Sequence, residues 1–170
     1  PEYDPKGRLF DPNLAGGALL DIGIYNLTVS HWVMGEFPKS HKIHAQMSET
    51  GVDELLAGVL VYENNVVSQF SCNFLSQNLN DFFIYGSKGH IRIHPNFWGS
   101  TQATLNVNGK EHIESAPFNA SGFEYQTAEA MRCIRAGLLE SPIMPHSTSL
   151  AMMKYMDKIR AEIGLKYPFE

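Results

Sequence analysis

The stretch that most constrains the fold is AGGALLDIGIY, residues 15–25. It combines two adjacent glycines, an apolar pattern with helical spacing, and two polar side chains four residues apart, Asp21 and Tyr25. Because positions i and i+4 of a helix are neighbours on one face, we expect Asp21 and Tyr25 to lie together, with Gly17 one turn before them. Apolar residues on the other faces continue to Met34 and predict a helix buried inside a domain.

This pair of polar side chains has two interpretations. In the first, a buried carboxylate accepts a hydrogen bond from a phenol, which offsets the cost of removing the carboxylate from water. In the second, the phenol exchanges a proton with a substrate hydroxyl and the carboxylate orients it, while the glycines let a substrate or cofactor approach closely. The residues by themselves leave both interpretations open.

Composition excludes several classes of function. The chain has 170 residues and a net charge of -5, and we predict one domain over residues 1–170. Lysines and arginines are scattered singly, so no basic stripe is available for a phosphate backbone and no nucleic-acid binding is predicted. No apolar run reaches the roughly 18 residues that span a bilayer, so no membrane association is predicted.

The cysteines and histidines give no sign of a metal site. Cys72 and Cys133 lack paired spacing and are predicted to be free thiols in a reducing cytoplasm, although a disulfide between them stays open. His90 and His94 are four residues apart in an extended run, without a third ligand at metal-site spacing. We therefore predict no metal.

The pattern after Gly35 and Pro38 changes from helical to alternating, which predicts strands. The expected strands are residues 41–48, 55–62, 66–75, 82–85, 90–93, 103–107 and 110–115. Tight turns at 64–65, 86–89 and 108–109 predict antiparallel hairpins. Helical spacing returns in residues 124–139 and 149–163, and Gly164 ends the second helix. This order predicts an α+β fold with a largely antiparallel, open sheet and helices on one face.

Aromatic residues are unusually frequent on the predicted strands. They are Phe70, Phe74, Phe82, Phe83 and Tyr85. Either all of them point into one core, or part of the sheet is covered by a second copy of the chain. Because they exceed what one face needs, we predict a homodimer that forms through the sheet.

Several of these motifs resemble one enzyme family. Residues 8–25, with the glycine pair, Asp21-x-Gly23 and Tyr25, resemble the second domain of the glucose-fructose oxidoreductase, inositol dehydrogenase and rhizopine-catabolism enzymes (Gfo/Idh/MocA). The resemblance continues through residues 82–93 (FFIYGSKGHIRI), 96–98 (NFW), 122–145 and 149–168. It is closest to the branch of dimeric dihydrodiol dehydrogenase.

The resemblance implies a cofactor and a set of site residues. Members of the family bind NAD or NADP mainly through an N-terminal dinucleotide-binding domain, and they place the equivalents of Asp21 and Tyr25 beside the nicotinamide. Arg8 and Gly17 are weaker candidates for cofactor binding. The family's Glu-Lys-Pro motif is absent from this sequence, and no G-x-G-x-x-G follows a strand. We therefore expect a fragment that is inactive alone.

The expected activity of the complete protein is hydride transfer to or from a secondary alcohol of a sugar, polyol or cyclic diol, with Tyr25 exchanging the hydroxyl proton. A tyrosine rather than the family's frequent histidine at position 25 indicates this substrate class. Two alternatives stay open. One is a non-catalytic protein of the same fold that binds a sugar or cofactor or serves dimerisation. The other is nicotinamide-assisted hydrolysis of a glycosidic bond.

Overall fold

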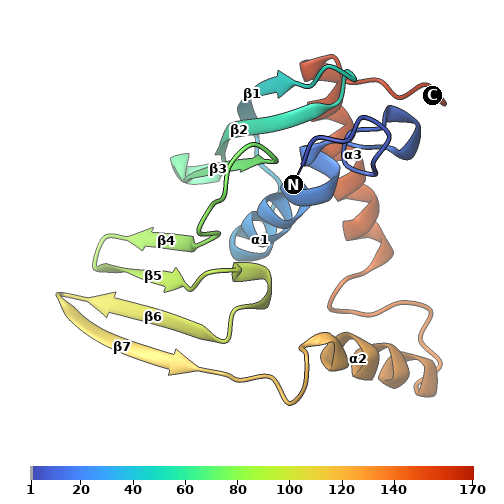
Figure 1. The fold of residues 1–170 in the computed structure, drawn as a ribbon. Coiled ribbons are helices and arrows are strands. Elements are labelled where there is room, and N and C mark those ends of the chain that lie inside the picture. The colour runs from blue at the N-terminus through green and yellow to red at the C-terminus, as the bar shows by residue number, and fades with distance from the viewer. Residues whose placement is uncertain (1) are drawn as a thin grey trace. The chain divides into compact units, whose positions relative to one another are not determined.

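The computed structural model describes residues 2–170, which divide into two compact units. The first unit comprises the chain up to Gln77 together with His146–Glu170, and the second comprises Asn78–Pro145. Each unit has its own antiparallel sheet (Figure 1). The predicted α+β fold with open antiparallel pairing is confirmed, but the strands form two sheets rather than one.

The first unit contains the glycine-rich stretch and a three-stranded sheet. Its elements are a 3-10 turn at Pro12–Leu14, a π-helix at Leu19–Gly23, α1 (Ile24–Met34), β1 (Ser40–Met47), β2 (Asp53–Val61), a 3-10 turn at Glu63–Asn65, β3 (Val67–Asn73) and α3 (His146–Ile163). The strand order is β1-β2-β3, and Ala57 of β2 pairs with His44 on one side and Ser71 on the other.

The core of the first unit lies between one side of this sheet and the helices. Alternate positions of β2 point into it, since Leu56 and Leu60 are fully buried. Met156 and Ile159 of α3 enter the same core at helical spacing, and Leu19 joins them from the π-helix. Met152 of α3 is also buried in this core.

The helix α1 is less buried than the sequence predicts. Leu27 and Ser30 are buried, but Trp32 is 78 % exposed and Tyr25 is 48 % exposed. The helix packs on the core along one side only, so the prediction of burial all round is wrong for this chain. It ends as predicted at Gly35, whose φ of 71° terminates the helix.

The second unit is built from successive hairpins followed by one helix. Its elements are β4 (Phe82–Gly86), β5 (Gly89–Ile93), a 3-10 turn at Phe97–Gly99, β6 (Gln102–Val107), β7 (Lys110–Ser115) and α2 (Phe123–Arg135). The strands pair in sequence order and antiparallel. Asn108 and Gly109 have φ values of 52° and 78°, so the predicted hairpin between β6 and β7 is confirmed.

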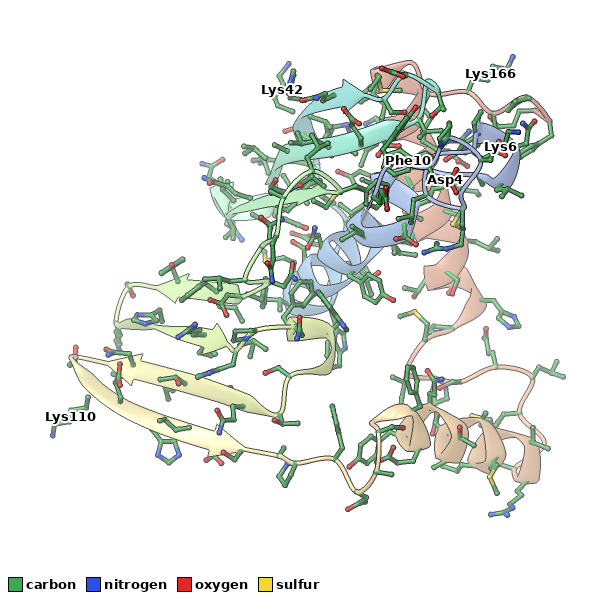
Figure 2. All side chains as sticks on the ribbon, in the orientation of Figure 1. Asp4, Lys6, Phe10, Lys42, Lys110 and Lys166 are labelled. Atoms are coloured by element: carbon green, nitrogen blue, oxygen red, sulfur yellow. The ribbon has the colours of Figure 1, made fainter. Side chains whose placement is uncertain are left out.

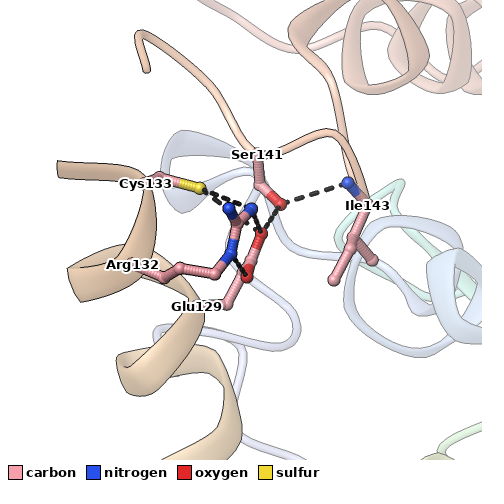
Figure 3. Close-up of polar contacts among 5 residues, drawn as sticks. All are labelled: Glu129, Arg132, Cys133, Ser141 and Ile143. Carbon is pink, nitrogen blue, oxygen red and sulfur yellow. Dashed lines mark hydrogen bonds and ion pairs between the residues drawn. The ribbon is translucent and has the colours of Figure 1, made fainter. Parts of the chain in front are cut away.

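The segment after α2 folds back onto that helix. The Glu129 carboxylate accepts hydrogen bonds from Arg132 Nε at 2.7 Å and from Ser141 Oγ at 2.6 Å, and Ser141 Oγ accepts one from the Ile143 backbone N–H at 3.2 Å (Figure 3). The hydrogen bonds from Arg132 and Ser141 lower the pKa of Glu129 to about 2. The helix ends before residue 139, the predicted end, because Gly137 adopts a φ of 68°.

Two further predictions concern thiols and surface charge. Cys72 and Cys133 are both free, which confirms the predicted thiols. The side chains of Lys42, Lys110 and Lys166 extend away from separate parts of the ribbon (Figure 2). Within residues 2–170, no helix is long and apolar enough to cross a membrane.

Candidate functional site

The glycine turn, defined here as residues 16–18, comes immediately before the π-helix. The backbone N–H of Gly16 donates to the Asp11 carbonyl at 3.0 Å, and that of Gly17 donates to the Leu9 carbonyl at 2.9 Å. A Cβ on Gly16 would lie 2.7 Å from the same Leu9 oxygen, and Gly17 has a φ of 126°. Position 16 therefore requires glycine because the Leu9 backbone is too close for a side chain, and position 17 requires glycine because other residues rarely adopt this φ.

A buried carboxylate lies against the turn. Asp53, the first residue of β2, has no exposed surface, and its Oδ2 accepts a hydrogen bond from the Leu19 backbone N–H at 2.6 Å. This bond caps the beginning of the π-helix from a distant strand, since helix N-termini favour negative charge and lack partners for their N–H groups. A Cβ on Gly17 would collide with Asp53 Oδ1, so glycine at position 17 admits the carboxylate.

The environment of Asp53 changes its protonation. Burial raises the pKa of Asp53 to about 6, and hydrogen bonds from the backbone N–H groups around Leu19 only partly oppose this effect. Among the described residues, Asp53 Oδ1 has no hydrogen-bond partner. An ionised form of this side chain is therefore costly to keep in the folded protein.

The C-terminal segment holds the other side of the glycine turn. Tyr167 is buried and its hydroxyl donates to the Gly16 carbonyl at 2.8 Å. The Arg160 guanidinium lies 4.4 Å from the centre of the Tyr167 ring, and it donates to Glu170 at 2.5 and 2.6 Å and to Asp157 at 2.8 Å. These contacts join α3 and the final residues to the turn.

The predicted catalytic residues follow the turn directly. Asp21 lies in the π-helix, where the Ile24 N–H donates to the Leu19 carbonyl, and such short π segments occur frequently at functional sites. The Asp21 carboxylate forms an ion pair with Arg8, and this hydrogen bond raises the pKa of the Arg8 guanidinium above its ordinary value. Tyr25 is the second residue of α1, with its side chain half exposed.

The structure thus places the four residues singled out in the sequence within one unit. It joins Arg8 to Asp21, although the two were proposed for different roles, and it gives Gly17 a packing role beside Asp53. Sequence reasoning missed Asp53 and Tyr167. Two acidic residues, Asp53 and Glu54, come directly before the apolar run LLAGVLV, and this was a usable signal for Asp53. Tyr167 had no such signal, because its partner is 151 residues away. In the described part of the chain, no cluster of three or more His, Cys, Asp or Glu residues could hold a metal ion.

Comparison with protein families gives a match to the model described as GFO/IDH/MocA C-terminal domain, over residues 1–92. Among curated proteins, trans-1,2-dihydrobenzene-1,2-diol dehydrogenase from Danio rerio is 32 % identical over 169 residues, covering 94 % of this chain and 50 % of the relative. The Homo sapiens protein of the same name is 31 % identical, covering 95 % and 50 %. The chain therefore spans about half the length of these relatives.

Solved structures show a similar fold. An aldose-aldose oxidoreductase from Caulobacter crescentus, complexed with glycerol, superposes with a TM-score of 0.81 at 24 % identity, covering 95 % of this chain and 50 % of that one. A 3-ketoreductase from Actinomadura kijaniata, in complex with NADP and TDP-benzene, gives a TM-score of 0.77 at 17 % identity with the same coverage.

Proposed function

The chain belongs to the Gfo/Idh/MocA family as a C-terminal domain of its oxidoreductases, and we propose that it forms the substrate side of an NAD- or NADP-dependent dehydrogenase. In this proposal it works with a nucleotide-binding half and acts on a secondary alcohol of a sugar, polyol or cyclic diol. The names of the relatives, a diol dehydrogenase and an aldose oxidoreductase, support this substrate class.

The observation that carries the proposal is the accessibility of Tyr25. A phenol on an apolar helix that served packing alone would be enclosed, but this side chain is 48 % exposed, on the same side of α1 as Trp32. Exposed apolar surface of this kind marks a binding face. A nucleotide-binding half that covered this face would enclose the phenol together with a substrate.

The residues present suit a nicotinamide cofactor and a hydroxylated substrate. The bound cofactor would accept or donate the hydride. Tyr25 would pass a proton to or from the substrate oxygen, a role worth about a hundred- to ten-thousandfold in rate for a well-placed group. Asp21, held by Arg8, would accept a hydrogen bond from a neighbouring substrate hydroxyl and so orient the reacting carbon. The exposed guanidinium of Arg8 would also lie at the edge of the cofactor site.

We also propose that the protein forms a homodimer through the sheet of the second unit. Phe83 and Tyr85 of β4 are exposed, and their rings stack at 5.6 Å with 5° between their planes. Arg92, which pairs with Phe83 across β4 and β5, lies 5.9 Å from its ring. Such a flat aromatic patch suits a two-fold contact with a second copy.

The test of the dehydrogenase is the Tyr25→Phe variant, made in the chain joined to its nucleotide-binding half. The assay follows absorbance of the reduced nicotinamide with NAD or NADP and a panel that begins with trans-dihydrobenzenediol and aldoses. We expect kcat to fall at least about a hundredfold, with the circular dichroism spectrum unchanged. Tyr85→Phe is the matched control, because it removes an exposed phenol from the other unit. Equal turnover in the two variants would remove Tyr25 from the mechanism.

A further inference from the structure

Two side chains that are distant in the sequence hold opposite sides of the glycine turn. Asp53 accepts the Leu19 N–H at 2.6 Å, and Tyr167 donates its hydroxyl to the Gly16 carbonyl at 2.8 Å. Both side chains are buried. Asp53 therefore fixes the N–H group of Leu19, and Tyr167 fixes the carbonyl group of Gly16, at the two ends of residues 16–19.

The glycine turn also sets the backbone positions of Arg8 and Asp21, which form an ion pair. The Asp21 N–H donates to the Gly17 carbonyl at 3.3 Å, and the Gly17 N–H donates to the Leu9 carbonyl at 2.9 Å. Leu9 is the residue next to Arg8. A change in the Gly17 peptide would therefore move the backbone at Arg8 and at Asp21 together.

An apolar side chain at position 53 could not accept the hydrogen bond from the Leu19 N–H. A buried carboxylate with one unpartnered oxygen costs more than an apolar side chain of similar size would cost in the same place. Tyr167 also holds its hydroxyl against Gly16 through its contact with Arg160, itself bound to Glu170 at 2.5 Å. The two contacts converge on the turn from β2 and from the C-terminal segment, so they constrain the peptide in two directions.

We propose that Asp53 and Tyr167 are positioning residues, which hold the glycine turn so that Arg8 and Asp21 keep their ion pair one helical turn before Tyr25. The inference deepens the dehydrogenase proposed above and rests on it for its catalytic consequence. Both side chains are buried, so in this proposal neither is a catalytic residue. They act through the backbone of residues 16–19.

The experiment compares Tyr167→Phe with Tyr62→Phe. Each variant removes one buried hydroxyl, since the Tyr62 hydroxyl hydrogen-bonds Ser30 at 2.8 Å. Tyr62 follows the last residue of β2, whereas Asp53 is its first, so the two lie at opposite ends of a strand that rises about 3.3 Å per residue. Amide hydrogen exchange is measured at residues 16–21, and kcat and KM are measured in the joined protein. We expect Tyr167→Phe to speed exchange at these amides about tenfold and to lower kcat about tenfold, with KM within about twofold.

The role of Asp53 is tested by two substitutions. Asp53→Asn keeps an acceptor for the Leu19 N–H and should keep amide exchange at residues 16–21 slow and kcat near that of the unmodified protein. Asp53→Leu removes the acceptor and should speed exchange at these amides and lower kcat. If Tyr167→Phe and Tyr62→Phe give equal exchange at residues 16–21 and equal kcat, the positioning role is overturned. If exchange changes as expected while the unmodified protein transfers no hydride, the turn is held as proposed and the dehydrogenase is the proposal that fails.

Discussion

Replacing Asp53 with Asn should change how the stability of the protein depends on pH. The pKa of Asp53 is raised from 3.8 to about 6 in the folded protein by burial. Between these two values the folded protein binds more protons than the unfolded chain, so its free energy of unfolding falls as the pH rises. Below about pH 3.8 this loss is absent, and above about pH 6 it is complete. The uncharged amide of Asn does not titrate.

The size of the effect follows from the same two values. Each pKa unit corresponds to about 1.4 kcal/mol, so the difference between 3.8 and about 6 amounts to about 3 kcal/mol. The ionisable groups facing Asp53 leave this window unchanged. Burial raises the pKa values of Tyr167 and Cys72 to about 12, so both are neutral. Arg160 is charged throughout, and its attraction is already included in the pKa of Asp53.

The measurement is urea unfolding of the Asp53→Asn variant and the unmodified protein at pH values from 3.5 to 8. The absolute stability of the variant is not decisive, because the amide also changes hydrogen bonding. The stability difference, variant minus unmodified, should rise by about 3 kcal/mol between about pH 3.8 and about pH 6 and then stay constant up to pH 8. Ile159→Val, a buried change that costs about 1 kcal/mol, serves as the control and should give a constant difference. Parallel curves for Asp53→Asn would refute the reasoning.

Two further predictions concern the glycine turn and the aromatic patch. Gly17→Ala should destabilise the protein by at least about 2 kcal/mol, since it combines a φ of 126° with a collision with Asp53. The control Gly51→Ala, with a φ of 84° and open space around it, should lose only about 1 kcal/mol. Equal losses of stability in thermal unfolding would contradict the packing role of Gly17. Tyr85→Lys should convert the proposed dimer into monomers by placing a charge in the aromatic patch, as light scattering would show, while an unchanged mass would place the interface elsewhere.

Much of the local structure follows from the sequence alone. The turns at Asn64, Asn65 and Asn108 adopt the positive φ values that asparagine tolerates, and Gly35 and Gly164 end their helices with φ values of 71° and 76°. These features depend on the conformational preferences of single residues, which act wherever the residue occurs. Alternating and helical apolar spacing likewise identified the strands and helices with the correct order.

Tertiary structure decided the surroundings of the site. The Asp21 carboxylate pairs with Arg8, 13 residues away, and Tyr167 reaches Gly16 across 151 residues. Spacing within one helix predicts which residues share a face, but not which distant chain segment meets that face. The wide turn of the π-helix and the depth at which Asp53 is buried also depend on packing between separate elements. The sequence by itself therefore determined the elements and the reactive residues, and only the folded chain decided how these residues are held and charged.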